Sequence, residues 1–294
     1  MIKIKKIQSR QVLTSDRENC SVCIIIPTYN EAANITRLLD MIYSRERKLH
    51  YRELNISMSI LVVDDNSPDG TAAAVRGYRK KNTSVNLLLR QNKNGLGAAY
   101  IAGMNHAIGS LHPDIIFEMD ADLSHDPDYI VPMIREIKKG ADFVIGSRYI
   151  TGGSIPEDWG IQRKIISRAA NTYTRTVLGI TNVHDCTGGF RAMRASMLEK
   201  IDLDSLNVKG YAFQISLLHA VMSNGGVIIE VPIAFHDRTD GKSKMQLNDM
   251  VEVGLVVFKM AARRILPAGR GEQKRDAEDM GQDIQHPAEN TTRI

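Results

Sequence analysis

The segment IIFEMDADLSHDPDY, residues 115–129, joins an apolar run to an acidic turn. Its first five residues are apolar apart from one glutamate and predict a short buried strand. The Asp-Pro pair at 126–127 predicts the start of a helix, capped by its aspartate or by Ser124. Asp120 and Asp122 therefore follow directly on the end of the strand. In open α/β sheets, ligands bind at this edge.

The two aspartates are spaced to converge on one point. In an extended backbone alternate side chains point the same way, so Asp120 and Asp122 face together while Ala121 faces away. Carboxylates held close repel each other, and a bound proton or cation relieves the repulsion. Hard oxygen ligands suit Mg²⁺ or Mn²⁺, which usually also contact substrate phosphates. The alternative for a single acidic pair is a cap for the next helix.

Short apolar runs alternate with helical patterns along most of the chain. The runs cover residues 22–26, 59–63, 85–89, 114–119, 141–146 and 226–233. Helices are predicted over residues 31–46, 70–81, 95–109 and 126–140. This alternation predicts βαβ units and an α/β, Rossmann-like fold with a mostly parallel central sheet. The runs are nearly continuous in apolar residues, as in strands covered on both faces.

A second acidic pair, Asp64 and Asp65, also ends a predicted strand. Adjacent side chains point to opposite sides, so only one of the two can face a ligand at a time. Such a carboxylate can accept hydrogen bonds from a nucleobase or a ribose. The first strand ends at Pro27, and Tyr29 offers a flat face for stacking on a base. Three such strand ends on one edge predict a nucleotide-diphosphate site.

Composition places the chain among globular proteins. Its 294 residues are 43% hydrophobic, enough for one large α/β domain or two small ones. The net charge of +4 is mild, and the basic residues lack interleaved aromatics, which argues against nucleic-acid binding. Cys20, Cys23 and Cys186, with no signal-peptide pattern, indicate a reducing, cytosolic compartment and buried thiols rather than a zinc site. No apolar run is long enough to predict a transmembrane helix.

The glycine-containing segment GLGAAY, residues 95–100, is a poor dinucleotide fingerprint. It follows a loop instead of a strand, and the third glycine is missing. Close backbone packing beside the acidic sites is the expected role.

The ends of the chain differ from its centre. Residues 1–20 are predicted to be an extension, and residues 267–294 are polar and aperiodic, as in a disordered tail. Residues 248–266 predict an amphipathic helix with a cationic end, suited either to a membrane surface or to packing on the domain. Residues 21–247 then form a single domain.

Several motifs occur in a fixed order from about Val22 to Met245. They are IIPTYNEAANI, VVDDNSPDGT, GLGAAYIAG, DADLSHDP, IGSRYITGG, the Arg-Lys pair at 163–164, DCTGGFRAMR and FHDRTDGKSKM. A single Asp-x-Asp is common, but this ordered series is specific. It resembles the inverting glycosyltransferases of family 2, with the GT-A fold, and within them the dolichol-phosphate (polyprenol-phosphate) mannose synthases.

The resemblance implies roles for particular residues. Nucleotide-sugar binding is expected at Pro27, Tyr29, Glu31, Val63, Asp64 or Asp65, Asp120, Ala121, Asp122, Arg148, Arg238 and Lys244. The metal is expected at Asp120 and Asp122, with Ser124 where the family often has a glutamine ligand. The acceptor phosphate is expected at Arg148, Arg163 and Ser167.

The chemistry of a phosphate acceptor indicates which groups the site needs. A phosphate monoester carries about −1.5 to −2 charge at pH 7, so it is already a nucleophile and needs no general base. The site must instead supply positive charge, for which Arg148, Arg163 and Arg238 are suited. Asp185 matches the base of relatives with hydroxyl acceptors. We expect it to position a neighbour or cap a helix, with catalysis as the alternative.

The expected activity is transfer of a hexose, mannose from GDP-mannose, to dolichyl or polyprenyl phosphate with inversion, using Mg²⁺ or Mn²⁺. The alternatives are a family 2 enzyme using a UDP-sugar such as glucose, and a non-catalytic nucleotide-sugar-binding protein. We expect the protein on the cytosolic face of a membrane, reached through residues 248–266 or through a membrane partner subunit.

Overall fold

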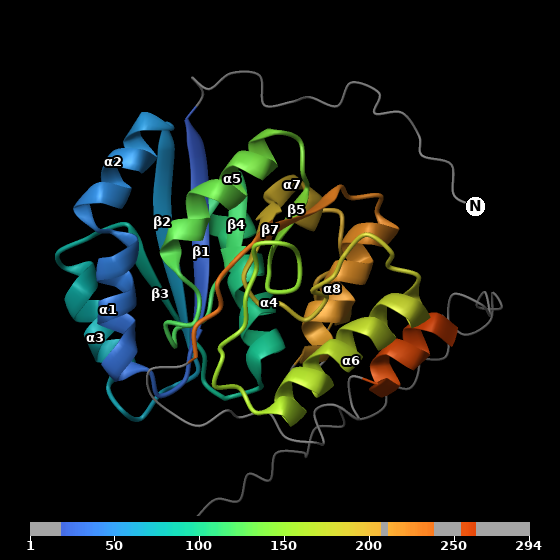
Figure 1. Cartoon of the computed structure of the whole chain (residues 1–294). Helices are drawn as coiled ribbons and strands as arrows, with labels where there is room; N and C mark the ends of the chain where they lie inside the picture. Colours follow the sequence, from blue (N-terminus) through green and yellow to red (C-terminus); the bar gives the residue numbers. More distant parts are fainter. Residues whose placement is uncertain (1–18, 207–210, 238–253, 263–294) are drawn as a thin grey trace, which may run out of the picture.

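A sheet of seven strands forms the centre of the protein in the computed structural model, which describes residues 19–206, 211–237 and 254–262 (Figure 1). The strands are β1 (Cys20–Thr28), β2 (Ile56–Asp64), β3 (Val85–Leu89), β4 (Ile115–Glu118), β5 (Phe143–Ser147), β6 (Arg191–Arg194) and β7 (Ile228–Pro232). Their order is β3-β2-β1-β4-β6-β5-β7, and only β6 runs antiparallel to its neighbours. The predicted α/β fold with a mostly parallel sheet is confirmed.

Helices cover both faces of this sheet (Figure 1). They are α1 (Ala32–Ile42), α2 (Arg45–Glu53), α3 (Thr71–Arg79), α4 (Leu96–His106), α5 (Ile130–Lys138), α6 (Ile161–Leu178), α7 (Ala195–Leu198) and α8 (Tyr211–Ser223). Short turns of other helix types cover Ala107–Leu111, Pro127–Tyr129 and Asp204–Leu206. Alternate residues of β1 belong to two different hydrophobic cores. Ile24 packs with residues of α1, α3 and α5, and Ile25 packs with residues of α4 and α8. Two buried faces explain the continuous apolar runs.

Strand β6 was not predicted from the sequence. Its four residues begin and end with arginine, so they show no apolar run. In the structure β6 lies between β4 and β5 and pairs with both in antiparallel register. The strand is therefore stabilised by tertiary contacts: Arg191 is fully buried, and Glu118, Phe143 and Gln214, which are distant in the sequence, lie against it.

The single helix predicted over residues 31–46 is interrupted at residues 43–44. Helix α1 ends at Ile42, and α2 begins at Arg45 after a break. Ser44 caps α2, since its side chain accepts a hydrogen bond from the backbone of Arg47 at 3.4 Å. The helix predicted at residues 126–140 is confirmed, with Asp126 as the cap and α5 following a short 3₁₀ turn.

The strand ends that carry the acidic residues meet at one edge of the sheet. Strands β2, β1 and β4 are adjacent and parallel, so their carboxyl ends lie side by side. Thr28 of β1 is in register with Asp64 of β2, which brings these two ends level. Asp120 and Asp122 follow β4 at the same edge.

The ends of the chain are described in part. Of the predicted extension, residues 1–20, only the last two are described, and β1 already begins at Cys20. Residues 254–262 form a helix beside α6 (Figure 1), and its Val257 is fully buried with α4 and α8. The remainder of the predicted 248–266 helix, and the tail at 267–294, lie outside the described residues. No described helix combines the length and the apolar character needed to cross a bilayer.

Candidate active site

The turn after β4 holds Asp122 with Ser124. The backbone N–H and the hydroxyl of Ser124 both donate to Asp122 Oδ1, at 3.1 and 2.6 Å. Leu123, between them, adopts a left-handed conformation with φ of 65°. Both polar side chains are almost fully buried. Ser124 thus orients the carboxylate of Asp122, and a role for Ser124 as a metal ligand stays a prediction.

Asp120 is held by two residues that the sequence interpretation did not select. The Tyr100 hydroxyl donates to Asp120 Oδ1 at 3.1 Å, and the Asp120 N–H donates to His125 Nδ1 at 3.1 Å. Tyr100 is fully buried against Phe213, and this burial raises its pKa well above the ordinary tyrosine value. Tyr100 therefore stays protonated and keeps its donor role. Gly97 and Tyr100 of the GLGAAY segment are buried, but a Cβ on Gly95 would meet nothing within 4 Å, so the expected close backbone packing is not found at Gly95.

The second acidic pair has two different environments. Asp64 accepts hydrogen bonds from the hydroxyls of Thr28 and Ser67, at 2.8 and 2.6 Å, and from the Ser67 backbone at 3.0 Å. It therefore ties the turn after β2 to the end of β1. Asp65 instead forms an ion pair with Arg90 at 3.0 Å. Burial raises the pKa of Asp65, although the charge of Arg90 opposes the shift.

The end of β1 brings the other expected nucleotide residues to the same edge. Pro27 pairs in register with Val63 of β2. Glu31 starts α1, and its side chain accepts a hydrogen bond from Asn34 at 3.0 Å. The Tyr29 ring is partly exposed, and the Lys93 ammonium lies 3.8 Å from its centroid. Lys93 thus covers one face of the ring expected to stack on a base, a contact that the sequence interpretation missed.

Arg148 and Asp185 form a bidentate ion pair. Nε and Nη2 of Arg148 each donate to one carboxylate oxygen at 2.7 Å, and the Arg148 backbone donates to Oδ2 at 3.0 Å. Asp185 is fully buried. Burial alone would raise its pKa, but the charge and hydrogen bonds of Arg148 outweigh this effect and lower the pKa of Asp185. Asp185 therefore positions Arg148 in this structure.

The other two residues expected at the acceptor phosphate lie on α6. The Arg163 guanidinium stacks 3.7 Å from the centroid of Trp159 and pairs with the half-exposed Asp237 at 3.5 Å. Ser167 accepts a hydrogen bond from the hydroxyl of Tyr149 at 2.6 Å, which connects α6 to the segment after β5. Arg238 and Lys244, expected at the phosphates of the donor, lie outside the described residues.

A fully buried arginine, also missed from the sequence, supports the loop before β6. Arg191 donates to the backbone oxygens of Gly188, Gln214 and Cys186, at 2.7, 2.6 and 2.9 Å. Glu118 lies 4.0 Å from it, and burial raises the pKa of Glu118 to about 7. Arg191 thereby connects the end of β4, α8 and the loop that carries Asp185.

The acidic turn fits a divalent ion shared with a diphosphate. In the described part of the chain no three histidine, cysteine or acidic side chains gather as a metal site. Mg²⁺, however, is commonly held by one or two carboxylates together with substrate phosphates. Gly189 places no side chain beside Asp120, where a Cβ would lie 3.8 Å from Asp120 Oδ2. The two aspartates supply the hard oxygen ligands that such an ion needs.

The chain is a glycosyltransferase of family 2. The family model described as "Glycosyl transferase family 2" matches residues 23–202, which contain the acidic edge of the sheet. Two curated relatives cover most of the chain. Polyprenol monophosphomannose synthase of Mycolicibacterium smegmatis is 39% identical, over 84% of this chain and 89% of the relative. Undecaprenyl-phosphate mannosyltransferase of Micrococcus luteus is 42% identical, over 76% of this chain and 87% of the relative.

Solved structures of glycosyltransferases share the fold. Glucosyl-3-phosphoglycerate synthase from Mycobacterium tuberculosis superposes with a TM-score of 0.58 at 17% identity, covering 86% of this chain and 83% of that one. Mannosyl-3-phosphoglycerate synthase from Rubrobacter xylanophilus gives a TM-score of 0.55 at 18% identity, covering 86% and 77%. The chain therefore has the GT-A fold.

Proposed function

We propose that this glycosyltransferase transfers mannose from GDP-mannose to a polyprenyl or dolichyl phosphate, with inversion at the sugar. The observation that carries the proposal is the position of Asp120 and Asp122 at the same sheet edge as the carboxyl ends of β1 and β2. The names of the two curated relatives, which share about four residues in ten with this chain, support mannose as the sugar and a polyprenyl phosphate as the acceptor.

The proposed donor site combines a base-binding region with an acidic turn. Tyr29, with Asp64 or Asp65, is proposed to contact the nucleoside, and the diphosphate is proposed to reach Asp120 and Asp122. A divalent ion, Mg²⁺ or Mn²⁺, is proposed at these two aspartates, and when bound it stabilises negative charge on the leaving diphosphate. A solved structure of glucosyl-3-phosphoglycerate synthase holds Mn²⁺ with UDP-glucose.

The proposed reaction needs no deprotonation of the acceptor. An oxygen of the lipid phosphate forms a bond to the anomeric carbon, the bond from that carbon to the diphosphate breaks, and its electron pair leaves with GDP. The acceptor enters as an anion. Arg148, positioned by Asp185, and Arg163 lower the repulsion between two anionic substrates. A role for Asp185 as a base is the alternative, and it is disfavoured because the Asp185 carboxylate accepts two hydrogen bonds from the Arg148 side chain.

Access to a membrane lipid is proposed through the amphipathic helix predicted at residues 248–266, on the cytosolic face. Its described part leaves Leu255 and Phe258 more than half exposed. A membrane partner subunit is the second route.

The test is incubation of the full chain with labelled GDP-mannose, a polyprenyl phosphate and Mn²⁺ or Mg²⁺, followed by counting label extracted into organic solvent. Asp122→Asn is expected to lower transfer at least about 10²-fold with an unchanged unfolding midpoint, and chelation of the metal should do the same. UDP-glucose is run in parallel to test the other donor. Nucleotide binding with no transfer from either donor would favour the non-catalytic alternative.

A further inference from the structure

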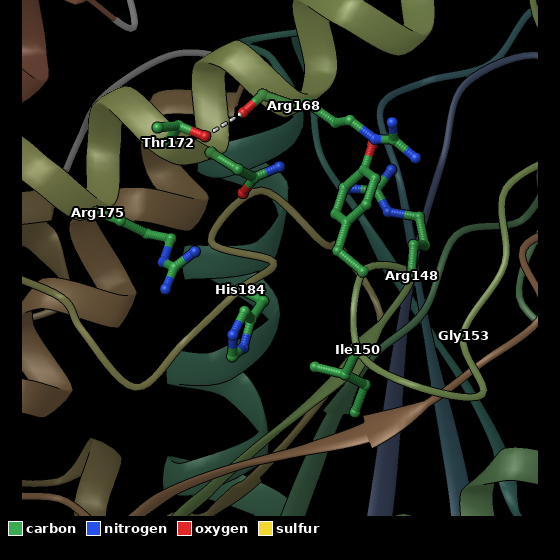
Figure 2. Close-up of a pocket in the computed structure, with 9 residues that line it drawn as sticks. Arg148, Ile150, Gly153, Arg168, Thr172, Arg175 and His184 are labelled. Atoms are coloured by element: carbon green, nitrogen blue, oxygen red, sulfur yellow. Dashed lines mark hydrogen bonds between the residues drawn. The ribbon is translucent and has the colours of Figure 1, made fainter.

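A cavity of about 430 Å³ lies between α6 and the segments that follow β5 and precede β6. Arg168, Asn171 and Arg175 line it from α6, and Arg148 and His184 line it from the other segments. Figure 2 shows Arg168 and Arg175 leaving α6 towards the side of the cavity that carries Arg148 and His184. The volume is within the range of pockets that bind small ligands.

The charges around this cavity favour an anion. Arg148 is paired with Asp185, and His184 lies 2.9 Å from the carboxylate of Glu230. Within the described residues, no acidic side chain forms an ion pair with Arg168 or with Arg175. Two guanidinium groups without a carboxylate partner are suited to phosphate, whose oxygens match the planar fork of their donors.

The same face of α6 is apolar beyond the cavity. Ile161 and Ile165 are 76% and 61% exposed. Counted along α6, the series Ile161, Ile165, Arg168, Thr172 and Arg175 has successive intervals of four, three, four and three residues, which places all five on one side of the helix. One helix face therefore carries an apolar half and a cationic half.

The neighbouring helix at residues 254–262 extends this apolar surface. Its Leu255 and Phe258 are 56% and 65% exposed. The Tyr173 hydroxyl of α6 donates to the Gly254 backbone oxygen at 3.2 Å, so the two helices are in contact (Figure 1). Grouped apolar side chains of this kind mark interaction surfaces. An occupant with an anionic head and an apolar tail complements both halves.

We propose that the Arg168–Arg175 cavity binds the phosphate head of an anionic membrane phospholipid, with Ile161 and Ile165 against the acyl chains. Helix α6 then lies on the bilayer surface. This inference goes beyond the proposed transfer, because the phospholipid is neither donor nor acceptor. A helix α6 that lies on the bilayer surface also places Arg163 and Ser167 at the depth of the lipid phosphates.

The test is sedimentation of the full chain with vesicles of phosphatidylcholine, with and without one quarter phosphatidylglycerol. Replacing both cavity arginines, Arg168→Gln with Arg175→Gln, is expected to weaken binding to the anionic vesicles about 30-fold at physiological salt, since each arginine near the surface contributes about a factor of five. On phosphatidylcholine alone the variant should equal the wild type.

The matched control removes the same charge elsewhere. Arg76 and Arg79 are exposed on α3, on the opposite side of the molecule from α6 (Figure 1). Arg76→Gln with Arg79→Gln should weaken anionic-vesicle binding less than about threefold. Equal losses in both double variants, or no loss in the cavity variant, would overturn the proposal. The proposal would also be overturned if soluble glycerol phosphate bound through the cavity arginines while vesicle binding did not depend on them.

A second measurement separates this site from the acceptor site. In detergent without phospholipid, the cavity variant should keep the wild-type KM for a short-chain polyprenyl phosphate. A raised KM would assign both arginines to the acceptor and overturn a separate phospholipid site. If the wild type transfers no sugar under any condition, the proposed function fails, and the vesicle result still decides the phospholipid site.

Discussion

Asp120 and Asp122 occupy the same turn but are oriented by different parts of the protein. Ser124, two residues along, holds Asp122, whereas Tyr100 from α4 holds Asp120. A metal ligand needs a fixed orientation, and hydrogen bonds to the ligating carboxylate supply it. Tyr100 is therefore a positioning residue for the proposed metal.

Tyr100→Phe tests this role. The ring still stacks on Phe213, but the hydrogen bond to Asp120 is lost, so affinity for Mn²⁺ in the presence of GDP should fall about tenfold. Free Mn²⁺ is counted by electron paramagnetic resonance, which needs no turnover. Tyr173→Phe, which removes an exposed hydroxyl bonded to Gly254, is the matched control and should leave the affinity unchanged. Equal affinities in both variants would assign Tyr100 to packing alone.

The Arg148–Asp185 pair predicts a pH-dependent loss of stability. Arg148→Gln leaves the buried carboxylate of Asp185 without its ion-pair partner and should lower the free energy of unfolding at pH 7 by about 3–5 kcal/mol. In the wild type the lowered pKa of Asp185 stabilises the folded protein at every pH above about 4, the pKa of an aspartate in the unfolded chain. This contribution is lost as the pH falls below that value. In the variant the unpaired carboxyl takes up a proton more readily.

The difference between wild type and Arg148→Gln should therefore shrink as the pH falls from 7 towards 4. Urea unfolding at several pH values measures it. Arg163→Gln breaks an exposed ion pair and should cost less than about 1 kcal/mol at every pH. A constant difference for Arg148→Gln across this range would contradict the assignment.

At the scale of elements, α4 is placed by its close approach to the sheet. A Cβ on Gly103 would lie 2.6 Å from Ile25 Cγ2 and 3.1 Å from Val63 Cγ2. The absence of a side chain lets α4 pack against β1 and β2 closely enough for Tyr100 to reach Asp120. The position of the helix thus determines the geometry of the acidic turn.

Gly103→Ala should lower the free energy of unfolding by about 1–3 kcal/mol through overpacking. Gly77→Ala is the matched control, because Gly77 lies within α3 and an added Cβ there meets nothing within 4 Å. That substitution should raise the free energy by about 0.5–1 kcal/mol through helix propensity. Urea unfolding of both variants gives the comparison, and a gain in stability for Gly103→Ala would contradict the packing argument.

The helix at residues 254–262 has a buried side and an exposed side. Val257 is fully buried among residues of α4 and α8, while Leu255 and Phe258 are exposed. The two alternatives for this segment, packing on the domain and contact with a membrane, are therefore compatible, because they require different faces of the helix.

Two truncations test this division. Ending the chain at residue 266 should leave the unfolding midpoint unchanged, as predicted for a disordered tail. Ending it at residue 247 also removes Val257, whose burial contributes about 1.5–3 kcal/mol, and should lower the midpoint by several degrees. Calorimetry measures both. An equal midpoint for the two truncated chains would show that the helix adds nothing to the core.

Local sequence was enough to predict most strands of the sheet and the edge of the sheet that carries the candidate site. Buried parallel strands need continuous apolar runs, and acidic or turn residues at their ends mark the carboxyl edge, so both signals lie within a few neighbouring residues. The ordered series of motifs indicated the glycosyltransferase family. Strand β6 lacked such a signal, because its two arginines interrupt any apolar pattern.

The partners of the site residues depended on the tertiary structure. Tyr100 meets Asp120 across 20 positions, and Arg148 meets Asp185 across 37. A hydrogen bond between such distant positions leaves no periodic pattern, since it depends on how helices and loops pack on the sheet. The apolar runs could therefore show where the acidic side chains gather, but only the packed chain shows which neighbours orient them and balance their charge.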